Sequence, residues 1–209
     1  MKDFDVSLYL VTDRNLLKAG IDFYDAVEEA LKNGVTMLQL REKDISSKEF
    51  YEIAVRLKDI AAKYSIPFII NDRIDIALSV DADGVHLGQE DLPCSIARKI
   101  MGDKKIIGIS AGSVDEAVKA ERDGADYIGA GAVFYTGTKK DIGEAIGLLN
   151  LEKIKKAVNI PVVAIGGIKY SNAQDVMKTG VDGISVVSEI MASDDIGFAT
   201  RRLKDAISK

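Results

Sequence analysis

The stretch KNGVTMLQL, residues 32–40, places a helix end, a glycine and a short apolar strand in immediate succession. The same order of helix end, small residue and strand entrance recurs in three further segments, residues 79–83, 122–126 and 178–182. Gly34, Gly124 and Gly180 are suited to the left-handed backbone that ends a helix before a strand. A unit of two strands and two helices is therefore repeated four times, and such a repeat closes naturally as an eight-stranded barrel.

Short runs rich in β-branched residues predict the strands. They are residues 8–11, 37–40, 68–70, 84–87, 106–109, 127–130, 162–165 and 183–186. Segments between them have apolar residues at helical spacing, such as residues 23–31, 48–63, 114–122, 151–158 and 173–178, and residues 193–209 are predicted to form the last helix. Continuous apolar strands separated by helices indicate parallel pairing with both sheet faces covered.

These patterns predict an α/β fold, a single (β/α)8 TIM barrel, with residues 1–209 as one domain. The alternative is an open doubly wound sheet. It is disfavoured because no Gly-x-Gly-x-x-Gly motif follows the first strand. A chain of 209 residues is short for a barrel, so its loops are expected to be short and to leave no room for a lid domain.

The composition restricts the class of function. Lys and Arg number 28 against 33 Asp and Glu, a net charge of −5, so no overall positive field exists for nucleic acid or an anionic membrane. One Cys and one His exclude an internal disulfide and a Cys/His zinc cluster. No apolar run approaches the roughly 20 residues that cross a bilayer. We therefore expect a cytoplasmic protein that binds small molecules, with no nucleic-acid or membrane partner; the oligomeric state stays open.

Polar residues follow the predicted strands, at the end where βα barrels hold their active sites. Arg41, Lys43 and Lys139 are cations that can bind several phosphate oxygens. Asp72 and Asp91 are hard oxygen ligands suited to Mg²⁺, which takes one or two carboxylates with water and phosphate oxygens. Any one of them could be a solvated loop charge, but together around one mouth they predict a site for a magnesium diphosphate.

A second anion site is predicted without charged residues. Gly166 and Gly167 follow the seventh strand, and Val187 and Ser188 follow the eighth. Barrels often build a phosphate site there from backbone amides, which a Cβ would keep at a distance. Two adjacent glycines alone would more often form a plain tight turn, but Ser188 after the neighbouring strand favours phosphate.

Two reactive side chains receive structural interpretations. His86 lies inside a predicted strand, so a packed or supporting role is favoured over that of a general base. Cys94 follows Pro93 near a helix start, has no adjacent base and is interpreted as structural.

Seven motifs, in chain order and across nearly the whole sequence, resemble the thiamine-phosphate synthase family. They are YLVTD (9–13), QLREK (39–43), IND (70–72), GVHLGQED (84–91), IS (109–110), TGTK (136–139) and IGGI (165–168). The resemblance implies a (β/α)8 barrel that joins 4-amino-5-hydroxymethyl-2-methylpyrimidine diphosphate to hydroxyethylthiazole phosphate. The products would be thiamine phosphate and diphosphate, with Mg²⁺ as cofactor.

The resemblance also implies roles for individual residues. The pyrimidine diphosphate would contact Gln39, Leu40, Arg41, Glu42, Lys43, Asn71, Ser110 and Lys139, of which Arg41, Lys43, Ser110 and Lys139 would be catalytic. Mg²⁺ would be held by Asp72 and Asp91. The thiazole phosphate would contact Thr136, Gly137, Thr138, Gly167, Val187 and Ser188.

The family mechanism is dissociative: diphosphate leaves, a pyrimidine-methyl cation forms, and the thiazole nitrogen attacks it. Such a mechanism explains why the sequence offers no evident general base or nucleophile. Two alternatives stay open, a thiazole tautomerase on a similar barrel and a non-catalytic regulator that binds thiamine intermediates. Neither has an evident use for the magnesium and diphosphate set.

One segment departs from the family pattern. After the sixth strand, where the family often has prolines, this chain has Ala132 and Tyr135. Residues 137–147 hold three glycines and several charges, and we interpret them as a hypothetical lid over the diphosphate.

Overall fold

The computed structural model describes residues 4–135 and 145–208, and its strands form one closed parallel barrel in chain order. The strands are β1 (Leu8–Val11), β2 (Met37–Leu40), β3 (Phe68–Asn71), β4 (Gly84–Leu87), β5 (Ile106–Ala111), β6 (Tyr127–Gly131), β7 (Val162–Ile165) and β8 (Gly183–Val186). β1 closes the barrel by pairing with β8, Leu8 lying opposite Ile184. The predicted (β/α)8 TIM barrel is confirmed.

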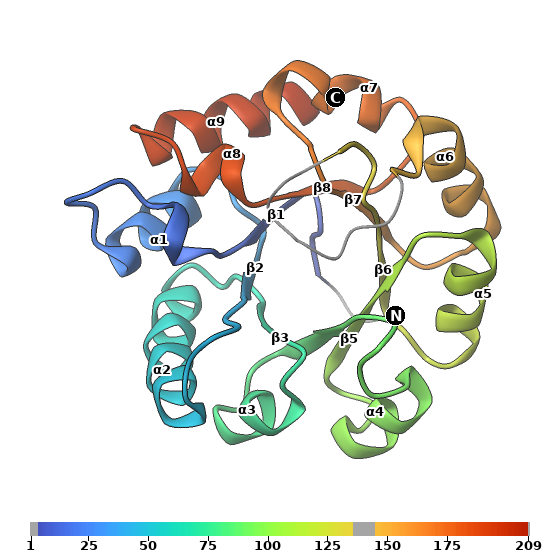
Figure 1. Ribbon diagram of the computed structural model, residues 1–209, viewed down its shortest axis with the longest axis horizontal. Helices are drawn as coiled ribbons and strands as arrows, with labels where there is room; N and C mark the ends of the chain where they lie inside the picture. The colour runs from blue at the N-terminus through green and yellow to red at the C-terminus, as the bar shows by residue number, and fades with distance from the viewer. Residues whose placement is uncertain (1–3, 136–144, 209) are drawn as a thin grey trace.

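Helices surround the strands as an outer ring (Figure 1). They are α1 (Phe23–Lys32), α2 (Ser47–Lys63), α3 (Ile74–Ser79), α4 (Cys94–Met101), α5 (Val114–Arg122), α6 (Gly147–Ala157), α7 (Tyr170–Met177), α8 (Ser188–Met191) and α9 (Ile196–Ile207), with a 3-10 turn, η1 (Arg14–Leu16). Among the described residues, none of the helices combines the length and the apolar character needed to cross a membrane.

Most predicted element bounds agree with the structure, and three helix starts do not. α9 begins at Ile196 rather than at residue 193, because the Asp195 side chain accepts from the Phe198 nitrogen at 2.8 Å. α7 begins at Tyr170 rather than at residue 173, because the Asn172 side-chain oxygen accepts from the Lys169 nitrogen at 2.8 Å and fixes an earlier first turn. α6 begins at Gly147 rather than at residue 151, where the Gly147 nitrogen bonds the Val133 carbonyl at 3.1 Å. All three starts depend on contacts that apolar spacing does not report.

The fourfold repeat has a hydrogen-bonded basis in the structure. Each repeated segment ends in a residue whose side chain accepts from the backbone nitrogen of the strand before it in the barrel. The pairs are Thr36 with Leu8 (3.0 Å), Asp83 with Phe68 (2.8 Å), Asp126 with Ile107 (2.8 Å) and Asp182 with Val162 (2.7 Å). These bonds lie just before β2, β4, β6 and β8, so they tie each even strand to its odd neighbour at the bottom of the barrel.

The predicted left-handed glycines are also present. Gly34, Gly124 and Gly180 have φ angles of 119°, 99° and 88°, a region that side chains with a Cβ rarely adopt. Each glycine lies two residues before the Thr or Asp whose side chain accepts from the neighbouring strand. The glycine and this acceptor therefore belong to the same turn between helix and strand.

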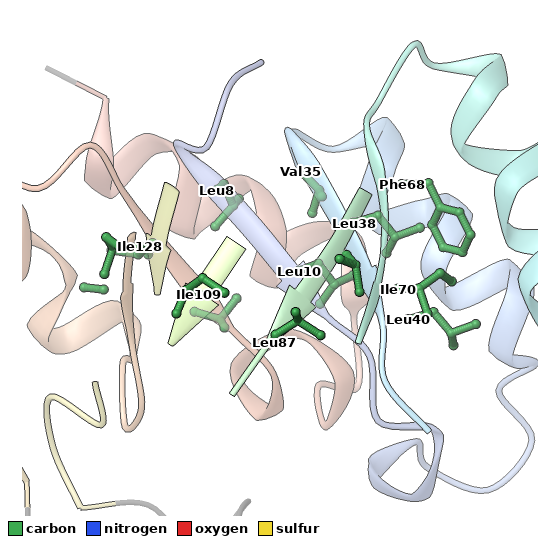
Figure 2. Close-up of a cluster of buried hydrophobic side chains, with 14 of the residues drawn as sticks. Leu8, Leu10, Val35, Leu38, Leu40, Phe68, Ile70, Leu87, Ile109 and Ile128 are labelled. Carbon is green, nitrogen blue, oxygen red and sulfur yellow. The ribbon is translucent and has the colours of Figure 1, made fainter. Parts of the chain in front are cut away.

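Side chains alternate along each strand between two separate apolar clusters. The outer cluster packs strands against helices, and Figure 2 shows Leu38, Leu40, Phe68 and Ile70 of this cluster grouped beside β2 and β3. The inner cluster fills the barrel and consists of Val6, Tyr9, Met37, Ile69, Ile106, Tyr127 and Val163. Toward the carboxyl ends of the strands, polar residues replace these inner apolar groups, and this change creates the mouth of the barrel.

Candidate active site

The mouth of the barrel begins with polar side chains that belong to the strands themselves. Gln39 on β2, Asn71 on β3 and Ser185 on β8 are buried at 3%, 7% and 3% exposure, and Ser110 on β5 is half-buried. Gln39 and Asn71 lie two positions after the inner-cluster residues Met37 and Ile69, and Ser110 lies four positions after Ile106, so alternation turns all three inward. Gln39, Asn71 and Ser110 are therefore held by the rigid sheet and not by loops.

Two carboxylates meet at the next level of the mouth. Asp72 follows β3 with a φ of 59°, a left-handed conformation that Asp tolerates better than most residues, and its nitrogen donates to the His86 carbonyl at 2.9 Å. Asp91 is oriented by the Gly88 nitrogen, which donates to Oδ2 at 2.7 Å. The Asp72 and Asp91 carboxyl groups lie close enough to interact by hydrogen bonding, so the structure brings together the two residues predicted to hold Mg²⁺.

The electrostatics of this pair favour an added positive charge. Burial raises the pKa of Asp91, and the neighbouring Asp72 carboxylate raises it further, against the opposing effect of the Gly88 N–H. Burial also opposes ionisation of Asp72, but hydrogen bonds with Lys43 and Asp91 bring its pKa below the ordinary value. The pair thus holds two carboxyl groups that repel when both ionise, and a divalent cation would relieve that repulsion.

The pair fits Mg²⁺ in its chemistry. Within the described residues, no group of three or more His, Cys, Asp or Glu side chains gathers around one point. Mg²⁺ does not require such a group, because it commonly binds through one or two carboxylates and takes its other oxygens from water and phosphate.

Cations border the carboxylate pair. Lys43 Nζ lies 2.6 Å from Asp72 Oδ2 and joins the loop after β2 to the loop after β3. The Arg41 nitrogen donates to Thr12 Oγ1 at 3.2 Å, which holds the start of the same loop against the end of β1. Lys139, predicted as the third cation, lies outside the described residues, as do Thr136, Gly137, Thr138 and most of the predicted lid.

The other two members of the 39–43 stretch turn their side chains away from the mouth. Leu40 is fully buried in the outer cluster. The Glu42 side chain is 6% exposed and pairs with Arg14, whose Nε lies 3.2 Å from Oε2. Arg14 also binds Glu49 of α2 at 2.8 Å, so this ion pair anchors the loop that carries Arg41 and Lys43. Leu40 therefore offers a ligand its backbone alone, whereas Glu42 also keeps Oε1, which is buried and has no hydrogen-bond partner among the described residues.

A glycine turn forms the opposite side of the mouth. Gly166 and Gly167 have φ angles of 96° and 66°, and a Cβ on Gly167 would lie 2.8 Å from both Phe134 Cβ and the Tyr135 carbonyl oxygen. Val187 and Ser188 follow the neighbouring strand β8, where Ser188 is exposed and begins α8. The two pairs predicted to bind phosphate are therefore at the ends of adjacent strands, β7 and β8.

His86 and Cys94 are placed as the sequence predicted. His86 lies inside the barrel on β4, with Nε2 2.9 Å from Ser110 Oγ and Nδ1 2.9 Å from the Tyr127 hydroxyl. Cys94 is buried at the start of α4, and burial raises the pKa of its thiol to about 11, so it is not a reactive thiolate at neutral pH.

The structure adds residues that the sequence interpretation missed. Gln89 Nε2 donates to the Ser110 carbonyl at 2.5 Å and braces the end of β5. Ser185 Oγ is buried in the mouth, and among the described residues it has no hydrogen-bond partner. Tyr9 and Tyr127 bring hydroxyl groups into the inner cluster. Period-two alternation marks all except Gln89 as inward-facing, but it does not show what they meet.

The family model and the relatives with more than 40% identity agree on one family. A family model described as thiamine monophosphate synthase matches residues 8–190. A thiamine-phosphate synthase of Clostridium novyi is 56% identical over 201 residues, covering 96% of this chain and 98% of the relative. That of Clostridium acetobutylicum is 54% identical over 209 residues, covering 100% and 98%. The solved structure of a thiamine phosphate pyrophosphorylase from Pyrococcus furiosus has 45% identity and a TM-score of 0.88, covering 97% of this chain and 95% of its own.

Proposed function

The chain belongs to the thiamine monophosphate synthase family, and from that premise we propose which residues carry its reaction and how. The protein is a transferase that forms thiamine phosphate. Its substrates, by the resemblance of its motifs, are 4-amino-5-hydroxymethyl-2-methylpyrimidine diphosphate and hydroxyethylthiazole phosphate. The tautomerase and the regulator lose support, because the relatives that match almost the full chain are named as synthases.

One observation carries the assignment of the diphosphate site: Lys43, Asp72 and Asp91, from three different loops, converge at one point of the mouth. Asp72 and Asp91 would hold Mg²⁺, which neutralises charge on a diphosphate when bound. Lys43 and Arg41 would bind the leaving diphosphate oxygens, and Lys139 would join them from the segment outside the described residues. Cations that meet the departing charge lower the barrier to breaking the carbon–oxygen bond.

The pyrimidine ring would lie above the strand ends, where Gln39, Asn71 and Ser110 offer amide and hydroxyl groups. These groups are buried or half-buried, so they exclude water from the methylene carbon that becomes cationic. The backbone of Leu40 and Glu42 completes this wall. The reaction that this arrangement supports is dissociative, since the chain's own residues stabilise the departing group and align the rings without a covalent nucleophile.

The thiazole phosphate would bind at the ends of β7 and β8. Gly167 allows close approach of its backbone, and Val187 and Ser188 supply amide and hydroxyl donors from the adjacent strand end. Thr136, Gly137 and Thr138 are assigned to the same phosphate by resemblance. The ends of β7 and β8 lie across the barrel from β3 and β4, so the thiazole nitrogen would approach the pyrimidine from the side opposite the diphosphate.

Diphosphate release tests the proposal. The protein is mixed with the pyrimidine diphosphate, the thiazole phosphate and Mg²⁺, and each of the three is omitted in turn. We expect release of diphosphate and formation of thiamine phosphate only when all three are present. Product formation without a divalent cation would refute the metal assignment. Binding of a thiazole phosphate without any turnover would favour the tautomerase or the regulator.

We propose that residues 1–209 act as one domain on these small molecules, without a nucleic-acid partner. A cytoplasmic location agrees with substrates that are charged and water-soluble.

A further inference from the structure

A continuous series of hydrogen-bonded side chains crosses the barrel interior from β2 to β5. Gln39 Nε2 donates to the Tyr9 hydroxyl at 2.6 Å, and the Tyr9 and Tyr127 hydroxyls lie 2.8 Å apart. The Tyr127 hydroxyl lies 2.9 Å from His86 Nδ1, and His86 Nε2 lies 2.9 Å from Ser110 Oγ. The series joins Gln39 and Ser110, both assigned above to the pyrimidine diphosphate, through three side chains that have no assigned role.

The backbone is shaped around this series. A Cβ on Gly108 would lie 2.0 Å from Tyr127 Cζ, and a Cβ on Gly129 would lie 2.8 Å from His86 Cε1. Both glycines are on the adjacent strands β5 and β6 and leave space where any other residue would collide with the ring. The rings also pack on each other, with centroids 5.8 Å apart for Tyr9 and Tyr127 and 5.5 Å apart for His86 and Tyr127. The series is therefore held in one geometry.

Each phenol in the series has a single hydrogen to donate. Tyr9 and Tyr127 are 2% and 0% exposed, and burial raises the pKa of both hydroxyls well above the ordinary value, so both stay protonated at neutral pH. Tyr9 accepts from Gln39, and donating its own hydrogen to Tyr127 is the arrangement that leaves no phenol hydrogen of the pair unused. Tyr127 then donates to His86 Nδ1. In this fully satisfied arrangement, the hydrogens point from β2 toward β5.

The direction continues through the imidazole. A neutral imidazole that accepts at Nδ1 carries its hydrogen on Nε2, and that hydrogen is donated to Ser110 Oγ. Ser110 accepts from His86, so its own hydroxyl hydrogen is left for the mouth. At the other end of the series, Gln39 donates an N–H to Tyr9, and its amide oxygen remains available as an acceptor.

We propose that Tyr9, Tyr127 and His86 are positioning residues that fix this direction, so that Ser110 presents a donor and Gln39 an acceptor to the pyrimidine. This inference rests on the proposed function and deepens it. A 4-aminopyrimidine carries the matching partners, an amino group that donates and ring nitrogens that accept. A 4-oxopyrimidine carries an acceptor in place of the amino group and is mismatched. The fixed direction would therefore select amino over oxo substrates.

The tautomer can be measured directly because His86 is the only histidine of the chain. In ¹⁵N NMR of the tag-free protein at neutral pH, we expect a protonated Nε2 and an unprotonated Nδ1. Tyr127→Phe removes the donor to Nδ1 and should remove this preference. A histidine protonated on Nδ1, or on both nitrogens, in the unaltered protein would overturn the proposed direction.

Kinetics test the positioning role separately. Tyr127→Phe should lower kcat/KM for the pyrimidine diphosphate about tenfold and reduce the preference for the amino over the oxo substrate by a similar factor. KM for the thiazole phosphate should not change. The matched control is Tyr64→Phe, which removes a hydroxyl bonded to Glu28 at 2.9 Å on the outside of the barrel and should leave all three values within about twofold.

A double-mutant cycle with Ser110→Ala decides whether Tyr127 acts through Ser110. If it does, adding Tyr127→Phe to Ser110→Ala should lower kcat/KM by less than about twofold more. Fully additive effects would show that the hydroxyl has only a structural role and would overturn the inference. Tyr9→Phe breaks the series one step earlier and gives the same test if Tyr127→Phe does not fold.

The outcomes separate this inference from the proposed function. If the unaltered protein forms no thiamine phosphate, or if Ser110→Ala has no effect on pyrimidine diphosphate turnover, the site assignment itself fails. If Ser110→Ala impairs turnover while Tyr9→Phe and Tyr127→Phe act independently of it, the site assignment stands and only the positioning role fails.

Discussion

Lys43 Nζ and Asp72 Oδ2 lie 2.6 Å apart, so a cation assigned to the diphosphate contacts a carboxylate assigned to the metal. Lys43 is about half exposed, whereas Asp72 is largely covered and has a left-handed backbone fixed by the His86 carbonyl. The carboxylate is therefore the fixed member of the pair and the lysine the adjustable one. This difference predicts distinct phenotypes for substitutions at the two positions.

Asp91→Ala removes one of the two assigned metal ligands. We expect thiamine phosphate formation to fall by a factor of about a hundred or more, with the apparent Mg²⁺ requirement raised, while the unfolding midpoint changes little. Asp72→Ala should act in the same direction. Activity is measured across a Mg²⁺ titration, with Asp175→Ala on α7 as a surface control that should match the unaltered protein. Near-normal turnover at low Mg²⁺ in either site variant would refute the assignment.

Lys43→Met removes the adjustable cation but keeps most of the side-chain length. The expected result is a loss of about 10- to 100-fold in kcat/KM for the pyrimidine diphosphate, because the departing charge loses one stabilising partner. KM for the thiazole phosphate should be unaffected. Lys48→Met, at an exposed lysine that pairs loosely with Glu52 at 4.0 Å, serves as the control. Equal effects on both substrates would show that Lys43 has a general structural role.

Gly167→Ala places a methyl group against Phe134 and the Tyr135 carbonyl at a φ of 66°. We expect a rise of at least about tenfold in KM for the thiazole phosphate and a loss of stability of about 1–2 kcal/mol. Gly180→Ala has a similar φ of 88° but meets no atom within 4 Å, so it should lose stability alone. Ser188→Ala should raise the same KM modestly, since backbone amides share the phosphate. An effect of Ser188→Ala confined to the diphosphate substrate would contradict the division of the mouth.

Glu42 provides a prediction for pH dependence. Burial raises the pKa of its carboxyl group above the ordinary value of 4.5, even with Arg14 beside it. The folded state thus binds this proton more tightly than the unfolded state, and the resulting stability is present below about pH 4.5 and lost as pH rises through the raised pKa. Glutamine does not ionise, so Glu42→Gln does not lose stability in this way as pH rises. The stability of this variant relative to the unaltered protein should therefore increase between acidic and neutral pH.

Urea unfolding of both proteins at several pH values measures the effect at Glu42. Glu28→Gln is a control of opposite sign, because a hydrogen bond from Tyr64 lowers the pKa of Glu28. Its carboxylate stabilises the fold above the unfolded pKa, and that stability is lost as pH falls through the lowered value. The two variants should therefore diverge in opposite directions as pH rises. Parallel curves for Glu42→Gln and the unaltered protein would contradict the burial effect.

Asp126→Ala tests how much stability comes from the repeated hydrogen bonds that join each even strand to the odd strand before it. Asp126 Oδ2 accepts from the Ile107 nitrogen at 2.8 Å and from Arg98 Nη2 at 2.6 Å, so its removal leaves a strand donor and a guanidinium without this partner. We expect a loss of about 2–3 kcal/mol in the free energy of unfolding, with substrate KM values unchanged. The exposed Asp103→Ala should cost less than about 0.5 kcal/mol. If Asp126→Ala lowers the free energy of unfolding no more than Asp103→Ala does, these hydrogen bonds add little stability.

Much of the fold could be predicted from the sequence because its signals are local. Five strands have the predicted bounds, and three, β3, β5 and β6, extend further toward the mouth than predicted. These extensions carry Asn71, Ser110 and Gly131, polar or small residues that do not look like strand interior when the chain is taken alone. Their neighbours in the sheet, not their own propensity, keep them in strand conformation.

The sequence predicted part of the arrangement of the site residues. The sequence identified Asp72, Asp91 and Lys43 as candidates because charged residues directly follow apolar strands, and the structure brings these three together. It did not show that the side chains of Leu40 and Glu42 turn away from the mouth. Alternation predicts which face of the strand a side chain takes, but the salt bridge of Glu42 to Arg14 needs a partner 28 positions away.

The sequence by itself determined the order of strands and helices, the left-handed glycines and the kinds of chemical group at the mouth, since each depends on spacing along a few residues. Only the tertiary structure decided that Tyr9 meets Tyr127, 118 positions away, and that the repeated Thr and Asp residues lock neighbouring strands. Such contacts depend on how a closed barrel staggers its strands. Closure brings opposite walls together at distances that no local period encodes.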